Sequence, residues 1–254
     1  VFIDEVDLET GSITARYNTW RDTGCEASNN EPLVFLEHMN NLIPDDAVRK
    51  EVLDYLAFNT QYPGKKTTFC PLITGEEGIG KSYLLHVMKN VLGISHVNEV
   101  TTENLNSDFN TWAEGSSMIF VEEIMCSGKR EMTNRLKTLL TSPTLQINAK
   151  KVNLKKIPNR VNFVLFSNER TPLILEKGDR RFLVYRSPLG KQPTSYYDKL
   201  FASLEDGEMY DIRGFLEQRD LSDFVPSKPA LLTEDKLAMI ASSESSAYLA
   251  LRLA

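Results

Sequence analysis

The sequence predicts an α/β fold in which helices cover both faces of a parallel β-sheet, with small helical subdomains before and after it. The chain has 254 residues, of which 41% are hydrophobic, enough for a sizeable core. Short apolar runs that are typical of buried strands alternate with helical patterns. The strand-like runs cover residues 69–74, 117–122, 161–167 and 182–185, and helical patterns cover 81–92 and 129–140. Such alternation is typical of a parallel sheet that is covered on both faces.

Three regions are expected along the chain. Residues 1–62 are predicted to form a hairpin around a turn at 9–12 and then a helical subdomain over 33–62, which Pro44 interrupts and Asp45 is placed to cap. Residues 63–188 are predicted to form the core that contains the sheet. In residues 189–254 the helical pattern returns at 196–204, 212–219 and 233–242, so a C-terminal helical region is expected.

The charge of the chain is unevenly distributed. The formal net charge is −6, which excludes a general polyanion binder of the basic-tail type. Residues 129–160, however, contain nine basic residues and a single acidic residue, Glu131. We therefore expect any contact with nucleic acid to lie within this basic segment.

The cysteines and the hydropathy pattern indicate a cytoplasmic, intracellular protein. Cys25, Cys70 and Cys126 are widely separated and form no Cys-x-x-Cys pair, and only three histidines are present to complete a metal site. We therefore expect reduced thiols, with Cys70 and Cys126 packed in the core, and no structural zinc. No run approaches the ~20 apolar residues of a membrane span, and no basic-then-apolar leader opens the chain.

The strongest motif is a glycine-rich loop between a strand-like run and a helical pattern. It fits the pattern G-x-x-x-x-G-K-[ST] and consists of Gly75, Glu76, Glu77, Gly78, Ile79, Gly80, Lys81 and Ser82. Glycines let the backbone curve around a phosphate, so that successive N–H groups and the helix N-terminus face the anion. Lys81 adds a positive charge, and the Ser82 hydroxyl is placed to bind Mg²⁺. The motif predicts ATP and Mg²⁺ as ligands; the alternatives are a chance glycine-rich turn and a loop that binds nucleotide without hydrolysing it.

Two further strand-like runs end in polar residues that suit the same site. Residues 117–122 run into Glu122 and Glu123, which are predicted to organise the Mg²⁺ shell and to polarise the attacking water, respectively. The division of labour between these carboxylates is open, and a solvated acidic strand end is the alternative. Residues 161–167 lead to Asn168, which is placed to sense the γ-phosphate or to hold the water. The alternative for Asn168 is an ordinary turn former.

The order of these motifs resembles that of superfamily 3 helicases, the AAA+-like P-loop NTPases of viral and phage replication. The resemblance covers roughly residues 17–240, and the stretches 18–20 and 178–182 are part of it. Within the family, the chain is similar to the helicase region of phage and poxvirus-type primase-helicases and of phage primase-polymerases. It implies an AAA+-like parallel sheet and a ring, usually a homo-hexamer, with ATP sites between subunits. Arg180 or Arg181 matches the arginine that reaches the phosphates held by the neighbouring subunit, and structural ion pairs are the alternative for one of the two.

The basic segment is predicted to contain a β-hairpin. Residues 145–156 read as two short β-type runs around a polar turn with four lysines, namely Lys150, Lys151, Lys155 and Lys156. In superfamily 3 helicases a hairpin in this interval points into the ring channel, so the resemblance implies that these lysines contact single-stranded DNA. No aromatic residue lies between Lys137 and Arg160, which favours contacts with the DNA backbone over base stacking. Without the resemblance, a solvated basic surface is the simpler interpretation.

With the resemblance, the motifs predict an ATP-dependent DNA helicase motor that moves along single-stranded DNA in the host cell of a phage or virus. A fused or associated primase-polymerase domain is an implied partner, because nothing in these residues resembles a nucleotidyl-transfer site. Two alternatives stay open. One is an AAA+-type ATPase that remodels protein or loads another factor, and the other is a nucleotide-binding assembly module in which Glu122 and Glu123 are catalytically idle.

Overall fold

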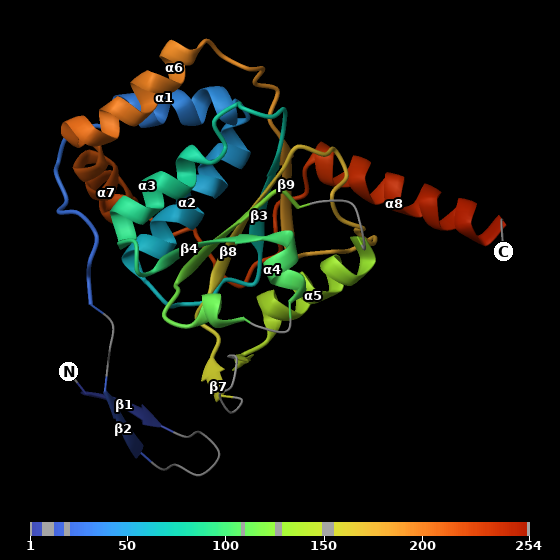
Figure 1. Cartoon of the computed structure of the whole chain (residues 1–254), viewed down its shortest axis with the longest axis horizontal. Coiled ribbons are helices and arrows are strands. Elements are labelled where there is room, and N and C mark those ends of the chain that lie inside the picture. The colour runs from blue at the N-terminus through green and yellow to red at the C-terminus, as the bar shows by residue number, and fades with distance from the viewer. Residues whose placement is uncertain are drawn as a thin grey trace.

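The computed structural model describes residues 2–6, 13–17, 21–107, 110–124, 129–148 and 155–252, and its centre is a five-stranded sheet. Every neighbouring pair of strands in this sheet is parallel. In spatial order the strands are β4 (Val97–Thr101), β5 (Met118–Glu122), β8 (Asn162–Ser167), β3 (Cys70–Thr74) and β9 (Phe182–Arg186). The prediction of a parallel sheet flanked by helices is confirmed (Figure 1).

Helices cover both faces of the sheet. One face packs against α1 (Leu33–Leu42), α2 (Asp46–Gln61), α3 (Tyr83–Leu92), α6 (Thr194–Ser203) and α7 (Met209–Gln218). The other face packs against α5 (Lys129–Thr141) and the first turns of α8 (Glu234–Arg252). The short helix α4 (Thr102–Asn106), a helical turn at Thr111–Ala113 and the α6–α7 junction at Leu204–Glu208 complete the helical elements of the described residues. None of these helices has the length and apolar content needed to cross a bilayer.

Two antiparallel hairpins lie outside the central sheet. In the first, β1 (Phe2–Val6) pairs with β2 (Ile13–Tyr17), which confirms the predicted N-terminal hairpin, while its predicted turn at 9–12 lies outside the described residues. In the second, β6 (Thr144–Ile147) pairs with β7 (Lys155–Pro158). The second hairpin arises where the sequence predicted two β-type runs around a basic turn.

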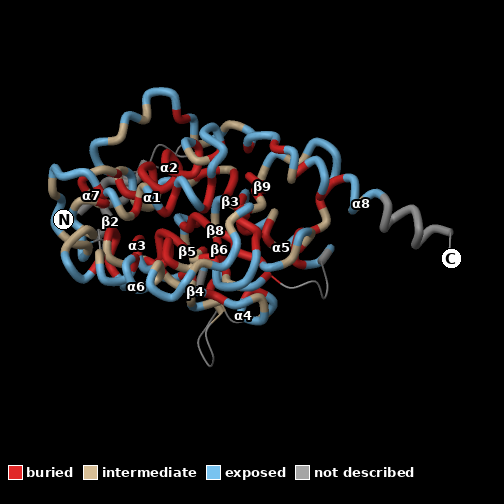
Figure 2. The backbone as a smooth tube through the Cα atoms, turned by 90° about the horizontal axis from the view of Figure 1, so that it is seen from above, coloured by how far each residue is buried: buried red, intermediate tan, exposed pale blue. Residues whose placement is uncertain are grey.

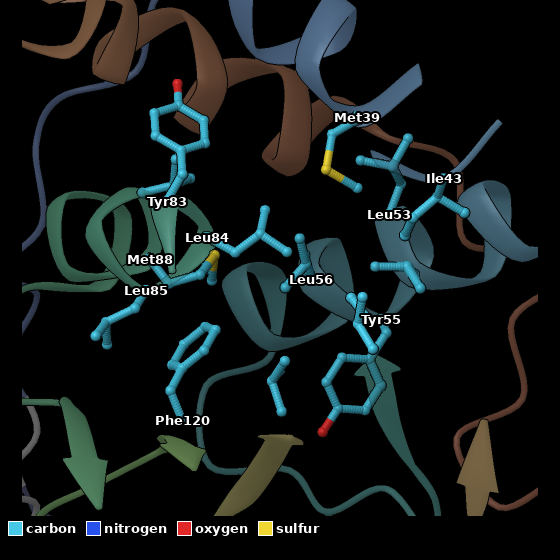
Figure 3. Close-up of a cluster of buried hydrophobic side chains, with 14 of the residues drawn as sticks. Met39, Ile43, Leu53, Tyr55, Leu56, Tyr83, Leu84, Leu85, Met88 and Phe120 are labelled. Carbon is cyan, nitrogen blue, oxygen red and sulfur yellow. The ribbon is translucent and has the colours of Figure 1, made fainter. Parts of the chain in front are cut away.

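The core consists of two apolar layers, one on each face of the sheet. Successive residues of a strand point to opposite faces; accordingly, Phe120 of β5 packs in the layer under α2 and α3, whereas Ile119 and Val121 pack against α5. Figure 3 shows Phe120 beneath the helices together with Tyr55 of α2 and Met88 of α3. The burial pattern in Figure 2 is densest along the strands, as expected for a sheet covered on both sides.

Helix boundaries follow local chemistry. Oδ1 of Asp45 accepts hydrogen bonds from the backbone N–H groups of Ala47 and Val48, both at 3.0 Å, and this caps α2 as predicted. Gly93 ends α3, the helix that follows the glycine-rich loop, because its φ of 92° is a conformation that favours glycine.

The sequence did not predict strand β4. Only Val97 and Val100 of its five residues are buried, and the strand lies at the edge of the sheet beside β5. An edge strand needs fewer apolar residues than a central one because one of its sides lacks a neighbour. The run Val-Asn-Glu-Val-Thr is therefore too polar to be recognised as a buried strand from its sequence. The boundaries at 62 and 188 that divide the chain into three regions stay predictions.

Replacing Asp45 with alanine is expected to lower the free energy of unfolding by about 1 kcal/mol, because two backbone N–H groups lose their acceptor. Asp45→Asn is the matched control, because asparagine caps helices about as well as aspartate, and its free energy of unfolding should stay close to that of the wild type. Urea denaturation of the three proteins measures the difference. Equal stability of the alanine and asparagine variants would show that the cap contributes nothing.

Candidate functional site

The polar residues predicted for one site do meet at one edge of the sheet. Because β3, β8 and β5 are adjacent and parallel, their carboxyl ends lie side by side. The glycine-rich loop follows β3, Asn168 follows β8, and Glu122 is the last residue of β5. Strand β8 lies between the other two, so the Asn168 amide is placed between the loop and the acidic strand end.

Lys81 is held in the loop by three acceptors. Its Nζ donates to the backbone oxygens of Gly75 at 3.2 Å and Glu76 at 2.8 Å, and to Oδ1 of Asn168 at 2.8 Å. Burial lowers the pKa of Lys81, and the nearby Glu122 carboxylate opposes this shift. The contact with Asn168 favours a role in the site for this residue over that of a turn former.

Ser82 and Glu122 form the second cross-strand contact. Oγ of Ser82 donates to Oε2 of Glu122 at 3.0 Å, while Oε1 of Glu122 is buried without a hydrogen-bond partner among the described residues. Burial raises the pKa of Glu122, and the hydrogen bond from Ser82 partly offsets that effect. A hydroxyl, a carboxylate and a free buried carboxylate oxygen are oxygen ligands of the type that Mg²⁺ prefers. The pair therefore fits a magnesium ion.

Two glycines of the loop have backbone angles that a larger residue would strain. Gly78 has φ 76° and Gly80 has φ 92°. A Cβ atom at Gly80 would also lie 2.7 Å from Cε1 of His38. The glycine at this position is therefore required both by the curvature of the loop and by a side chain packed against it.

His38 is a residue of the site that the sequence analysis missed. It lies on α1, is fully buried, and places Nε2 at 3.2 Å from the backbone oxygen of Gly80 and Nδ1 at 2.9 Å from the hydroxyl of Tyr196. Burial lowers the pKa of His38 to about 4, so the ring is neutral at pH 7. Because Gly80 offers only an acceptor, the proton is on Nε2. His38 thus contacts the loop from a helix that lies more than thirty residues earlier in the chain. No motif in the sequence around His38 indicates this contact.

Glu123 lies at the same edge as the loop but makes a different kind of contribution. Its φ of 51° is in the left-handed region, which is uncommon for a residue other than glycine, and its backbone oxygen accepts a hydrogen bond from the Thr102 hydroxyl at 2.7 Å. The side chain is exposed and lines a cavity of about 450 Å³ together with Asn168 and the loop. This backbone conformation directs the chain away from β5 immediately after Glu122, the kind of strain that functional sites often contain.

Arg186 is a second residue that the sequence analysis missed. It is the last residue of β9 and lies opposite Thr74, the residue before the loop. Its Nη1 is buried without a hydrogen-bond partner among the described residues. Its charge also contributes to the lowered pKa of Lys81, after the larger effect of burial. Two cations, Lys81 and Arg186, therefore lie near each other at this edge, and one donor of Arg186 has no acceptor among the described residues.

Arg180 and Arg181 lie at the opposite edge of the sheet. They precede β9, whose first residue pairs with Cys70 at the start of β3, so β9 separates them from the loop by about 16 Å. Arg180 is exposed, whereas Arg181 is half-buried with Nη1 3.9 Å from Oδ2 of Asp179. Neither arginine reaches the loop of its own chain, and the action of one of them on a neighbouring subunit stays a prediction.

The predicted DNA-binding lysines are only partly described. Lys150 and Lys151 lie outside the described residues, and Lys155 is placed only as the first residue of β7. Lys156 pairs with Gln146 across the hairpin and is exposed. Of the predicted core cysteines, Cys70 is fully buried in β3, and Cys126 lies outside the described residues.

Comparison with known proteins gives one match to a protein family and one to a phage enzyme. A model described as a family of unknown function (DUF5906) matches residues 73–181. Over 135 residues the chain is 33% identical to the DNA primase-polymerase of Nitratiruptor phage NrS-1, a match that covers 52% of this chain and 19% of the phage protein. The chain thus spans a small part of that relative.

Solved structures of the C-terminal region of NrS-1, both apo, share the fold. One is 27% identical with a TM-score of 0.72 and matches 86% of this chain and 53% of the solved chain. Another is 26% identical with a TM-score of 0.76 and matches 91% of this chain and 57% of the solved chain. The predicted resemblance to a phage primase-polymerase is confirmed, while the assignment to superfamily 3 stays a prediction. The chain is homologous to part of the NrS-1 primase-polymerase and shares the fold of its C-terminal region.

Proposed function

We propose that this chain is an ATP-driven DNA helicase motor of phage replication. Copies of the chain assemble into a ring, a homo-hexamer, that moves along single-stranded DNA. One observation carries the proposal: two adjacent residues of the glycine-rich loop are hydrogen-bonded to the ends of two other strands, Lys81 to Asn168 and Ser82 to Glu122. A chance glycine-rich turn would not require such partners. The fold in this proposal is that of a P-loop NTPase of the AAA+ type.

Each residue of the site has a role in this proposal. The loop N–H groups and Lys81 bind the phosphates, and Ser82 with Glu122 would hold Mg²⁺. Glu123 polarises the attacking water and Asn168 holds that water or contacts the γ-phosphate. When bound, Mg-ATP supplies the phosphoryl group whose hydrolysis provides the energy. The burial of Lys81 and Glu122 strengthens their interactions with charged ligands because the surroundings screen them less than water does.

Two sets of arginines act on the phosphates from different chains. Arg186 lies beside the loop of its own chain, so it donates to the nucleotide bound there. Arg180 or Arg181 acts on the nucleotide of the neighbouring copy, and the exposed Arg180 is the more accessible of the two. A cation in that position stabilises the charge that develops on the transferred phosphoryl group.

The DNA partner is supported by homology and by charge. The homologous phage protein is named a DNA primase-polymerase, although this chain matches only 19% of it. Strand β7 of the β6–β7 hairpin contains Lys156 and belongs to the basic segment 129–160. Lysines of this hairpin would bind backbone phosphates without regard to DNA sequence. DNA synthesis itself is not part of the proposal.

The proposal is tested by ATP hydrolysis with and without single-stranded DNA, at protein concentrations that permit ring assembly. We expect DNA to stimulate hydrolysis, Lys81→Ala to abolish it, and the wild type to unwind a forked duplex when ATP is present. Turnover that is indifferent to DNA would contradict the motor and favour an ATPase that remodels protein. ATP-dependent assembly without turnover would favour a nucleotide-binding assembly module.

Glu122→Gln is expected to abolish Mg²⁺-dependent hydrolysis while raising the free energy of unfolding at pH 7, the trade-off common at functional sites. The pKa of Glu122 is raised in the folded protein, so the native state holds this proton more tightly than the unfolded chain does. The wild type therefore loses stability as the pH rises through the folded-state pKa, and glutamine avoids this loss. The gain should shrink as the pH falls and Glu122 becomes protonated.

Thermal unfolding of the wild type and the variant between acidic and neutral pH measures this difference. Glu123→Gln is the matched control, because the neighbouring carboxyl is exposed and its removal should change stability by less than about 0.5 kcal/mol. A Glu122→Gln variant that is less stable than the wild type at pH 7 would show that the buried carboxylate stabilises the fold.

Arg186→Ala is expected to lower kcat/KM for ATP by about tenfold to a hundredfold, the effect of losing one hydrogen bond to a charged group. A mixing experiment distinguishes its role from that of the other arginines. Mixed rings of Lys81→Ala with the double variant Arg180→Ala/Arg181→Ala should regain activity, because an intact site and an intact arginine pair then meet at some interfaces. Rings of Lys81→Ala with Arg186→Ala should not, and recovered activity in them would show that Arg186 acts on the neighbouring chain.

A further inference from the structure

A second cavity, of about 560 Å³, lies at the edge of the sheet opposite the phosphate loop. Its walls come from the segment before β3, the junction between α5 and β6, the residue after β7, and the arginine pair before β9. The ten residues that line it are Lys66, Thr68, Leu140, Thr141, Ser142, Pro143, Asn159, Arg180, Arg181 and Ser227. The cavity is distinct from the proposed ATP site, because the two lie at opposite ends of β9.

The lining has the composition of an anion site. Three of its residues are cations, and five carry a hydroxyl or an amide, while no acidic residue is among the ten. Asp179 lies behind this wall, where its carboxylate is fully buried and pairs with Lys236 of α8 at 3.6 Å. Arg181 is 3.9 Å from the same carboxylate, too far for a hydrogen bond, so this contact does not saturate the guanidinium.

The side chains of both arginines in the cavity have donors without a partner among the described residues. Nε of Arg181 is buried without a hydrogen-bond partner, and Arg180 is exposed and forms no ion pair among the described residues. Lys66 is half-buried, and its Nζ donates to the backbone oxygen of Val161 and lies 5.5 Å from the centre of the Phe163 ring. Burial lowers the pKa of Lys66 to about 8, and a bound anion would reverse that effect. A buried donor without an acceptor costs stability that a phosphate oxygen would restore.

We propose that this cavity binds a backbone phosphate of single-stranded DNA, with Lys66 as its inner cation and Nε of Arg181 as a second donor, while the exposed Arg180 is the arginine that reaches the neighbouring copy. The position of the cavity at the root of the β6–β7 hairpin favours DNA as the source of the phosphate. Ser142 and Pro143 directly precede β6, and Asn159 directly follows β7. The exposed Arg160 and Lys156 continue the positive charge from the cavity onto the hairpin. This inference rests on the proposed function, because it extends the DNA contact of the hairpin into the body of the chain.

A phosphate group in this cavity has a second possible origin, the nucleotide held by a neighbouring copy. The two origins differ in the conditions under which the phosphate binds. Contact with DNA needs no nucleotide, whereas contact with a neighbour's phosphates needs both ATP and association of copies. Binding of DNA in the absence of nucleotide therefore separates them.

The experiment measures the binding of a fluorescein-labelled oligothymidylate to the full chain without nucleotide, by fluorescence anisotropy over a range of salt concentrations. We expect Lys66→Met to weaken binding about tenfold and to reduce the slope of log K against log salt by about 0.7, the effect of one lost phosphate contact on a single strand. Lys65→Ala is the matched control, because this neighbouring lysine is exposed and lies over the Tyr62 ring, outside the cavity. It should leave both quantities unchanged.

Ser227→Glu is a second test that does not remove a half-buried side chain. Ser227 is an exposed residue of the cavity wall, so the variant should fold, and its carboxylate should repel a phosphate and weaken binding in the same way. Thermal unfolding of each variant confirms that the fold is intact. Lys66→Arg, which keeps the charge, should retain most of the affinity.

The outcomes separate this inference from the proposed function. If the wild type and Lys65→Ala bind DNA, Lys156→Ala weakens binding, and both cavity variants bind like the wild type, the cavity proposal is overturned and the motor stands. If the cavity variants bind DNA normally but lower ATP hydrolysis only at concentrations where copies associate, the phosphate belongs to the neighbour's nucleotide and the DNA assignment is overturned. Failure of the wild type to bind DNA would overturn both proposals.

Discussion

The arrangement of the site depends on one constraint, the insertion of β8 between β3 and β5 in a fully parallel sheet. Parallel strands bring their carboxyl ends to one edge, and the buried apolar residues of each strand fix the register at which they do so. This register lets Lys81 reach Asn168 and lets Ser82 reach Glu122. A shift of a strand by one residue would exchange its side chains between the two core layers, so the packing of these layers protects the geometry of the site.

The site is costly to the fold that holds it. Burial lowers the pKa of Lys81 and raises that of Glu122, so it disfavours the charged form of both groups. Among the described residues, Nη1 of Arg186 and Oε1 of Glu122 are buried without hydrogen-bond partners. Unpaired buried atoms also occur away from the loop, on Glu51, Trp112 and Glu208. At the loop edge, however, the two unpaired atoms are an acceptor of Glu122 and a donor of Arg186, which a bound cation and a bound anion would satisfy.

The sequence predicted those features whose cause is local. The loop from Gly75 to Ser82, the acidic end of β5 and the Asx cap at Asp45 each depend on neighbouring residues, and each is found in the expected place. His38 and Arg186 were missed because their contacts with the loop arise only when α1 and β9 pack beside it. The strand β4 was missed because an edge position makes an apolar run unnecessary. The edge on which Arg180 lies likewise follows from strand order, which composition and periodicity do not encode.

The two edges of the sheet are connected by a segment that consists of Thr233 and the first turn of α8. Asp235 accepts a hydrogen bond from the backbone N–H of Arg186 at the loop edge, and Lys236 pairs with Asp179 at the opposite edge. Between them the Thr233 hydroxyl donates to the backbone oxygen of Val184. Strand β9 is thus bound along its length by β3 on one side and by this segment on the other. The two ends of β9, one beside the glycine-rich loop and the other beside the arginine pair and the second cavity, are therefore held by the same two neighbours, β3 and the start of α8.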